Sequence, residues 1–368
     1  MGHGWDYSYN LRVELSGPNV LLHDGNTRSD LYLAQPDGTW ARQEFFRVLG
    51  QQLDGSFRLT FADTGQWNFK PLDGSPAAGK ISTIVDRNGN ALSFAYDGVG
   101  RLSSITDTFG RQVTLQYNPS GFIESVTDFA GRQVRYAYYQ DGDSGGSFGD
   151  LKSMTTPAVV GTPHNDSPAG KATLYTYSQG SSEPQLDHNL LTITDPKGQT
   201  YLQNTYDPTT NPLDPDFDHL RRQVWGDPGD IIDVVYFRQA PDATNGFARN
   251  KAIVNDRLGN VREYLYDSRN RLVIEREYTG RANPDLPTTD LDNRPTGKLR
   301  PTDPNYFETR WAYNADSLPT SITRPNLGST VKTYEFDLDP SAPRRSRGNL
   351  RQVTRNPGPL GGDQTSIT

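Results

Sequence analysis

The sequence has no cysteine, and its hydrophobic content is low. The absence of cysteine among 368 residues excludes disulfide cross-links, so order must come from hydrogen-bond ladders and packing. Hydrophobic residues make up 33% of the chain, which is low for a thick core. The 19 tyrosines and 15 phenylalanines instead supply large rings that can stack on one another. This composition favours an extended sheet of one layer.

The chain also lacks a long apolar run and an excess of positive charge. No stretch of about 18 apolar residues occurs, and MGHGWDYSYN is not a charged-then-apolar leader. We therefore expect no membrane span, and we expect any export signal to lie outside this chain. The 44 acidic and 37 basic residues give a net charge of -7, which disfavours nucleic acid as a partner because phosphate binding needs clustered cations.

Patterns typical of catalysis, metal binding and cofactor binding are scarce. No G-x-S-x-G motif occurs, and the histidines show no spacing that would place two metal ligands on one face. The histidines are His3, His23, His164, His188 and His219. We therefore predict no catalytic residue, no metal site and no cofactor.

Three acidic stretches allow a second interpretation. DRNGN at Asp86 and DGDSGGSFGD at Asp141 resemble calcium loops, but neither has the spaced ligands and final glutamate of an EF-hand. The formation of turns explains both stretches, and calcium binding is the alternative interpretation. Asp214, Asp216 and Asp218 lie beside prolines, which predicts a polar, solvent-facing loop.

What the sequence does contain is a repeat of 21 residues, in which Asp, Gly and Tyr recur at fixed positions. Three regular copies are Asp86, Gly89 and Tyr96, then Asp107, Gly110 and Tyr117, then Asp128, Gly131 and Tyr138. Less regular copies contain Asp195, Gly198 and Tyr206, then Gly229 and Tyr236, then Asp256, Gly259 and Tyr266. Catalysis seldom needs several copies of one unit, whereas a stack of similar elements does.

Each repeat has the pattern of a β-hairpin. RQVTLQY alternates, so that Val113, Leu115 and Tyr117 share one face of a strand. DTFG, NPSG and DFAG are turn sequences with glycine in the left-handed region, which predicts positive φ at Gly110 and Gly131. RLSSITD and FIESVTD break the alternation and predict a bulge or a twist. FRLTFADTGQWNF, residues 57–69, has the pattern of a lead-in hairpin.

The equivalent positions also predict contacts between neighbouring hairpins. We expect Tyr96, Tyr117 and Tyr138 to stack on or near one another. The arginines that follow the turn glycines are expected to pair with Asp107 or Asp128 of a neighbouring hairpin, with anion binding as the alternative. These arginines are Arg101, Arg111 and Arg132.

The repeats divide the chain into a lead-in β segment, residues 1–80, and a repeat sheet, residues 81–368. Segments rich in Pro, Gly and Asp interrupt the sheet at about 141–171, 207–219 and 281–305, and we expect loops there. GNLRQVTRNPG after Gly348 begins another unit, and the chain stops at Thr368. We therefore expect a piece of a longer protein.

The phrases YDGVGRLSSITDTFGR, YDSRNRL and DRNGNALSFAYDG resemble the YD repeats of RHS proteins, of Tc-toxin shell subunits and of teneurins. The resemblance spans about residues 21–354, and VLLHDGNTRSDLYLAQPDGTW resembles the segment that opens an RHS shell. It implies an all-β fold of tandem hairpins in a continuous, spiralling antiparallel sheet, which in this family closes around a toxic C-terminal polypeptide. The family's self-cleaving aspartate site has no match here.

Three functions follow as hypotheses. The first is a non-catalytic segment of a secreted or cell-surface shell, whose partners are the enclosed C-terminal toxin domain of the same full-length protein and other shell or secretion components. The second is a surface adhesion or recognition module that binds a glycan or a protein. The third, an enzyme on a β scaffold that acts on polysaccharide, has little support because paired carboxylates for glycoside cleavage are not recognisable in the sequence.

Overall fold

The computed structural model describes residues 1–226, 230–282, 294–325, 331–357 and 364–368. In these ranges the protein consists of 27 β-strands, two short 3-10 helices, Pro184–Leu186 and Arg344–Ser346, and no α-helix. The predicted all-β class of tandem antiparallel hairpins is therefore confirmed. No helix in the described ranges has the length and apolar character needed to cross a bilayer.

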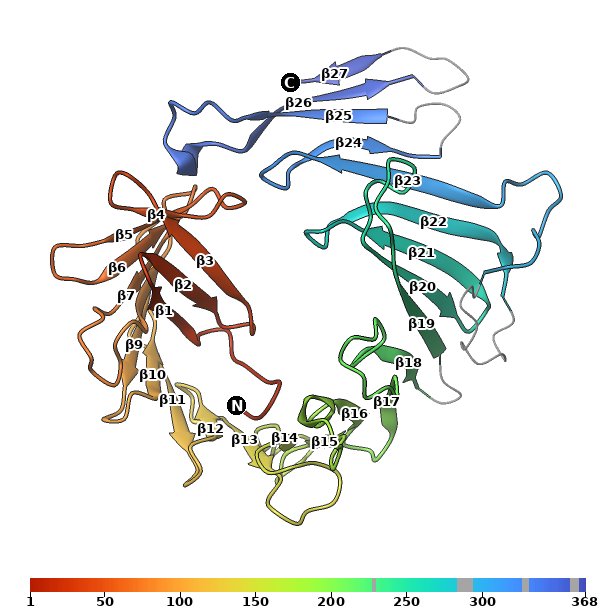
Figure 1. Ribbon diagram of the computed structural model, residues 1–368. Helices are drawn as coiled ribbons and strands as arrows, with labels where there is room; N and C mark the ends of the chain where they lie inside the picture. Colours follow the sequence, from red (N-terminus) through yellow and green to blue (C-terminus); the bar gives the residue numbers. More distant parts are fainter. Residues whose placement is uncertain (227–229, 283–293, 326–330, 358–363) are drawn as a thin grey trace. The chain divides into compact units, whose positions relative to one another are not determined.

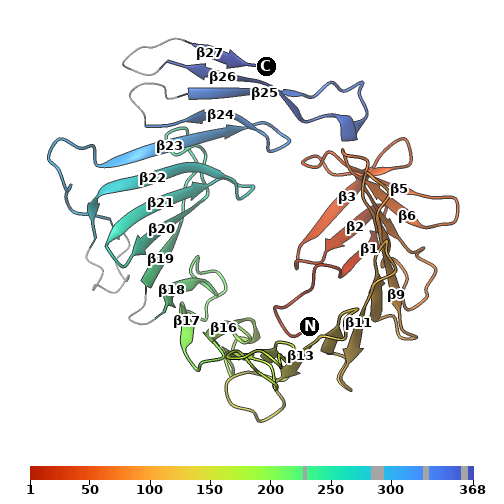
Figure 2. The ribbon, with the colours of Figure 1, turned by 180° about the vertical axis from the view of Figure 1, so that it is seen from behind.

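The chain forms two compact units (Figures 1 and 2). The first contains Met1–Gln179 and Asp339–Arg347, and the second contains Gly180–Leu338 and Gly348–Thr368. The predicted division between residues 80 and 81 falls inside the first unit, directly before a strand that starts at Ile81. Where the lead-in segment ends and the repeat region begins stays a prediction.

The first unit is a meander in which each strand pairs antiparallel with the next strand in the chain. Its strands are β1 Leu11–Ser16, β2 Asn19–Asp24, β3 Ser29–Ala34, β4 Trp40–Ala41, β5 Val48–Gln51, β6 Phe57–Thr60, β7 Gln66–Phe69, β8 Ile81–Val85, β9 Ala91–Tyr96, β10 Leu102–Thr106, β11 Gln112–Tyr117, β12 Ile123–Thr127, β13 Gln133–Tyr138, β14 Leu151–Thr155 and β15 Ala172–Tyr177. The pairing of β6 with β7 confirms the predicted hairpin at residues 57–69.

The second unit continues the same antiparallel pairing of consecutive strands. Its strands are β16 Leu190–Thr194, β17 Thr200–Tyr206, β18 Leu220–Trp225, β19 Asp230–Arg238, β20 Asn250–Asp256, β21 Asn260–Tyr266, β22 Leu272–Arg281, β23 Tyr306–Tyr313, β24 Pro319–Thr323, β25 Val331–Asp337, β26 Asn349–Asn356 and β27 Thr365–Ile367. Most strands are rich in Val, Ile, Thr, Tyr and Phe, residue types that suit a half-buried pleated surface.

Bulges recur at the repeat tyrosines. Between β11 and β12, Gln116 faces Ser125 and Tyr117 faces Ile123, so one residue of β12 is left over. The same shift occurs between β9 and β10, where Tyr96 faces Leu102. Of the predicted bulge or twist in RLSSITD and FIESVTD, the structure shows the bulge. An extra residue increases the local twist of a hairpin pair.

The core of the first unit lies between two layers, which corrects the expectation of a single layer. Strands β1 to β3 pack against strands from β5 to β10 (Figure 1). The fully buried residues at this contact are Leu11, Val13, Val20, Leu22, Tyr32, Leu49, Phe57, Leu59, Phe69, Ile81 and Leu102. Alternating apolar residues in β1 and β2 supply the second layer. Many of the chain's buried hydrophobic side chains therefore lie at this contact between the layers.

The second unit has a smaller apolar cluster of Ala248, Leu265, Val273 and Ile274, against which Tyr313 packs. Several charged and polar side chains of this unit are also buried, including Asp233 and Glu263. Buried charges need partners, because an isolated charge in a low-dielectric interior is strongly unfavourable. The second unit therefore depends on polar pairing in addition to apolar packing.

The predicted loops are partly correct. Residues 141–171 are not one loop, because LKSMT forms β14 between two irregular segments; the surrounding glycines and prolines obscured a short alternating strand. No strand lies between Tyr206 and Leu220, as predicted for 207–219. Of the segment 281–305, residues 283–293 lie outside the described residues, and 294–305 contain no strand.

Candidate functional site

The aspartate of each repeat organises its own turn. The carboxylate of Asp107 accepts hydrogen bonds from the backbone N–H of Phe109 and of Arg111, both at 2.9 Å. The N–H of Gly110 donates to the carbonyl of Asp107 at 2.9 Å, and Gly110 has a φ of +78°. A positive φ suits glycine because it has no Cβ. The aspartate and the glycine therefore have complementary structural roles in one turn.

The same turn recurs in both units. Gly131 has a φ of +78° and Gly100 a φ of +83°, so the prediction for Gly110 and Gly131 is confirmed. The aspartates that accept backbone hydrogen bonds in this way are Asp86, Asp97, Asp107, Asp128, Asp195, Asp256 and Asp267. Gly89, Gly198 and Gly259 also have positive φ, whereas Gly229 lies outside the described residues.

The arginines close these turns from within. Arg111 lies 2.6 Å from Asp107, and Arg132 lies 2.6 Å from Asp128, each pair four residues apart in one turn. The prediction that they pair with a neighbouring hairpin is wrong. Positive φ at the glycine turns the chain so that the side chain of the next residue returns to the aspartate. Exposed pairs of this kind contribute little stability individually.

Hydrogen bonding also sets the ionisation of the turn carboxylates. Partial desolvation raises the pKa of Asp107, but the hydrogen bonds from Arg111 and from backbone N–H groups outweigh it and hold the pKa below its ordinary value. In Asp86, the side chain of Asn90 is the main cause of a lowered pKa. These hydrogen bonds therefore favour the charged form of Asp107 and Asp86.

The repeat tyrosines make a second recurring contact. The hydroxyl groups of Tyr96, Tyr117 and Tyr138 donate to the carbonyls of Ile81, Leu102 and Ile123 at 2.7, 2.8 and 2.7 Å, in each case 15 residues earlier. Each acceptor is the first residue of the strand that opens the same hairpin. Burial raises the pKa of Tyr117 to about 12, so the hydroxyl stays a donor. We refer to these contacts as the tyrosine ladder.

The rings of the ladder are covered by the residue that precedes each acceptor. Arg101 lies 4.7 Å over the ring of Tyr117, Phe122 stacks on Tyr138 at 4.8 Å, and Lys80 lies 5.7 Å over Tyr96. The predicted stacking of one repeat tyrosine on the next is not among the ring contacts of these described residues. Cations and aromatic rings are alternative partners for the same ring face.

Two tyrosines of the second unit make the same type of contact as the tyrosine ladder. Tyr206 donates to the carbonyl of Leu190 at 3.2 Å, and Tyr313 donates to Leu272 at 2.9 Å. Tyr313 was missed because residues 282–305 lengthen its repeat, although AYNADSLPTSIT is similar to AYDGVGRLSSIT. Tyr236 instead lies 4.5 Å from the ring of His219, and no such carbonyl bond is found for Tyr266 within the described part of the chain.

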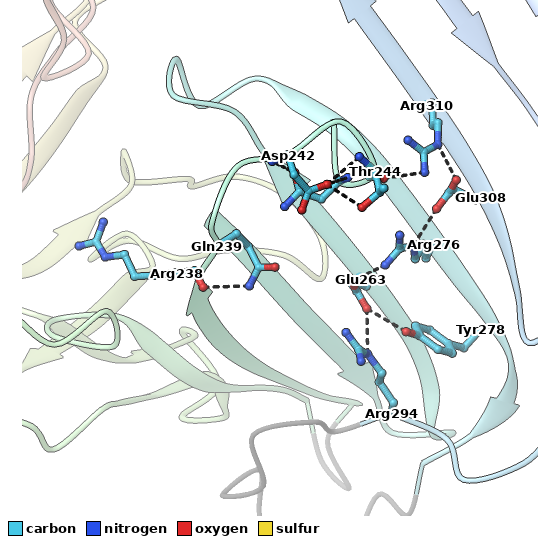
Figure 3. A network of polar contacts seen from close by, with 11 residues as sticks. Arg238, Gln239, Asp242, Thr244, Glu263, Arg276, Tyr278, Arg294, Glu308 and Arg310 are labelled. Atoms are coloured by element: carbon cyan, nitrogen blue, oxygen red, sulfur yellow. Dashed lines mark hydrogen bonds and ion pairs between the residues drawn. The ribbon is translucent and has the colours of Figure 1, made fainter. Parts of the chain in front are cut away.

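A buried polar network crosses β21, β22 and β23 (Figure 3). Glu263 is 1% exposed and accepts hydrogen bonds from Arg276 and Arg294, both at 3.0 Å, and from the hydroxyl of Tyr278 at 2.8 Å. Arg276 also lies 2.8 Å from Glu308. Glu263 faces Arg276, and Arg276 faces Glu308, in the register of the strands. The opposite charges at facing positions in these strands could have indicated this network.

The acidic and histidine-containing segments do not assemble a metal centre. In the described ranges, no group of three or more His, Cys, Asp or Glu side chains could hold a metal ion. Asp214 accepts the N–H of Asp216 at 3.0 Å, and Asp218 accepts the side chain of Asn189 at 2.6 Å. These aspartates are half-buried and shape the loop, which corrects the prediction that they face solvent. Burial, with a smaller contribution from Asp207, raises the pKa of Asp216.

The first unit also has an apolar surface on β9 to β13. A cavity of about 380 Å³ is lined there by Leu115, Val126 and other apolar residues, with Tyr7 and Tyr9 from the N-terminal segment. Its charged side chains, Asp107 and Arg111, belong to one ion pair. This surface offers apolar contact and few free hydrogen-bonding groups.

Successive hairpins share one type of turn and the contacts of the tyrosine ladder. These shared features define a tandem β-hairpin repeat protein. The sequence model of the RHS Repeat family matches residues 76–112 and 96–133, the stretch in which turn and ladder are most regular. Residues 76–133 therefore consist of RHS repeats.

Two solved structures have a distant similarity to this chain. The crystal structure of TcdB2-TccC3-Cdc42 has 13% sequence identity and a TM-score of 0.39, with 95% of this chain and 19% of that chain covered. The structure of TcdB2-TccC3 has 13% identity and a TM-score of 0.39, with coverage of 97% and 21%. The chain thus spans about one fifth of the length of these chains. A search of curated proteins found no match.

Proposed function

We propose that this chain is a non-catalytic segment of an RHS shell that encloses the C-terminal toxin polypeptide of the same full-length protein. The observation that carries the proposal is the identity of the repeated residues. They are the aspartates and glycines that shape turns and the tyrosines that join the two strands of a hairpin. Repetition of such groups supports a wall built from equivalent elements.

The apolar cavity on β9 to β13 is a second support. A polypeptide held in an incompletely folded state exposes apolar side chains, and a surface lined by Leu115, Val126 and Tyr136 is chemically suited to contact them. In this proposal the full-length protein is secreted or presented at the cell surface, and other shell or secretion components are further partners.

Limited proteolysis of the full-length protein tests the proposal. The C-terminal polypeptide should resist cleavage in the native protein and become sensitive in a Gly110→Val variant that disturbs one turn. Gly98→Val is the matched control, because Gly98 has no positive φ and an added Cβ meets no atom within 4 Å. Equal cleavage in all three proteins would contradict enclosure.

A screen of this chain against glycan, peptide, ester and phosphoester substrates, with and without divalent metals, tests the non-catalytic part. We expect no turnover. Activity that survives repurification and disappears with one loop substitution would overturn it.

One observation favours adhesion as the second candidate function. Phe109 and Phe129 are 80% and 57% exposed at two turn tips, and the guanidinium of Arg111 lies 5.4 and 5.1 Å from their rings. Exposed aromatic and arginine side chains are common at protein-binding surfaces. Loss of cell-surface binding by the full-length protein in a Phe109→Ala/Phe129→Ala variant, without any change in protease resistance, would favour adhesion over the shell.

A further inference from the structure

A second cavity of the first unit differs in chemistry from the apolar one. It has a volume of about 660 Å³ and is lined by four aromatic side chains, three carboxylates and one guanidinium. These are Phe45, Phe46, Phe61 and Trp67, then Glu44, Asp63 and Asp86, then Arg47. We propose that this cavity binds a small organic cation, an alkylammonium or guanidinium group with a short apolar body. The proposal is independent of the shell function.

The aromatic wall provides the first argument. Phe61 and Trp67 meet edge to face, with ring centroids 5.1 Å apart and an interplanar angle of 67°, and both are half-buried. The face of an aromatic ring carries a negative potential, and tryptophan is the strongest ring partner for a cation. The apolar body of a ligand can contact the same rings.

The protein's own guanidinium groups show that this wall accepts such cations. Arg47 lies 4.2 Å from the ring centroid of Phe45 and 5.6 Å from that of Phe61. Arg344 of the same unit lies 5.8 Å over Phe46 and donates a 3.0 Å hydrogen bond to the carbonyl of Phe45. The rings that line the cavity thus already contact two guanidinium groups of the chain.

The carboxylates supply charge complementarity. Asp63 and Asp86 lie in turns at the same end of neighbouring hairpins, because Gln66 pairs with Val85 in the register of β7 and β8. Asp63 accepts the N–H of Gly65 at 3.0 Å, and Asp86 accepts that of Asn88 at 2.8 Å. Among the described residues, neither carboxylate takes part in an ion pair. Glu44 is partly compensated, since Arg42 lies 3.5 Å away.

The charges that line the cavity therefore favour a cation over an anion. A neutral ligand would use the aromatic wall alone, and an anion would face Asp63 and Asp86. A cation with an apolar body uses both features. The ligand can be a free amine, or an arginine or lysine side chain, which share this chemistry.

Isothermal titration of the 368-residue chain at low salt tests the proposal. The probes are choline, its neutral isostere 3,3-dimethylbutan-1-ol, and N-acetylarginine amide. We expect choline or N-acetylarginine amide to bind at least about fivefold more tightly than the neutral alcohol, with quenching or enhancement of Trp67 fluorescence. Tighter binding of choline indicates a free amine, and tighter binding of the arginine amide indicates a side chain.

Asp63→Asn/Asp86→Asn is the test variant. Asp54→Asn is the matched control, because Asp54 accepts the N–H of Ser56 at 3.0 Å in an exposed turn and does not line the cavity. The double variant should weaken cation binding by about fivefold or more, and the control should leave it unchanged. Circular dichroism should show equal folding of all three proteins. The proposal would be overturned if neither cation bound more tightly than the alcohol, if neither cation bound at all, or if Asp54→Asn weakened binding as much as the double variant.

Discussion

The hydroxyl of Tyr117 donates a 2.8 Å hydrogen bond to the carbonyl of Leu102, 15 residues earlier in the chain. Tyr117 ends β11, and Leu102 begins β10, so the bond closes the open end of a hairpin. Without it, a partly buried carbonyl next to a bulge would lack this partner, and unpaired polar groups are costly when water is excluded. The tyrosine therefore repeats because each hairpin has the same open end.

Gly110→Val should destabilise the first unit by about 1 to 2 kcal/mol, because a β-branched residue tolerates positive φ poorly. A Cβ at Gly110 would meet no atom within 4 Å, so the cost comes from the backbone and not from a clash. Urea denaturation of Gly110→Val and of the control Gly98→Val measures it. Equal midpoints for the two variants would contradict the turn assignment.

Thr64→Gly should stabilise the protein. Thr64 has a φ of 72° in the turn between β6 and β7, where the neighbouring Gly65 does not adopt the left-handed conformation. A positive φ is strained for threonine and unstrained for glycine, whereas glycine loses more backbone entropy on folding. The balance of the two effects should raise the free energy of unfolding by about 0.5 to 1 kcal/mol. Ser120→Gly, in a turn residue without positive φ, is the control and should not stabilise. A lower denaturation midpoint for Thr64→Gly would refute the argument.

Glu263→Gln should cost about 3 kcal/mol or more, because it removes the buried negative charge that Arg276 and Arg294 share. Glu277→Gln is the matched control. Glu277 pairs with Arg262 at 3.1 Å on the exposed side, where both side chains are more than half exposed, and its loss should cost less than about 1 kcal/mol. Thermal unfolding measures both. Similar losses would show that the network is not effectively buried.

The turn carboxylates should make the stability of the fold depend on pH in the acidic range. The folded pKa of Asp107 and Asp128 lies below the ordinary value of 3.8, so their stabilisation is complete above that value and is lost as pH falls through the folded pKa. Asp107→Asn/Asp128→Asn should therefore lose less stability than the native protein between pH 6 and pH 3. Asp141→Asn is the control, since Asp141 accepts no side-chain hydrogen bond in the described part of the chain. An unchanged pH dependence in the double variant would contradict this role.

The turns were the most predictable part of the structure, because Asp and Gly at a fixed spacing determine a local conformation. The partner of Tyr117 was not predictable, since the accepting carbonyl depends on the strand register and on the bulge at Tyr117. The pairing of Arg111 was assigned to the wrong hairpin because the closeness of residues four apart arises only from the left-handed glycine.

Contacts between distant elements were the hardest to predict. The packing of Leu11 and Val13 against the repeat sheet depends on how β1 to β3 fold over it, which the pattern of those strands alone does not specify. The cavity beside Trp67 combines residues from three segments of the chain. Such a site can be found only after the hairpins have been placed side by side.

The most direct test of the central claim, that the repeated residues are structural, removes three ladder hydroxyls together. Tyr96→Phe/Tyr117→Phe/Tyr138→Phe keeps every ring and should lower the free energy of unfolding of the first unit by about 2 to 4 kcal/mol, the sum of three hydrogen bonds. Tyr9→Phe/Tyr136→Phe is the control, because these hydroxyls make no hydrogen bond within the described residues. Urea denaturation should separate the two proteins clearly. A triple variant within about 0.5 kcal/mol of the control would contradict the structural role of the repeat.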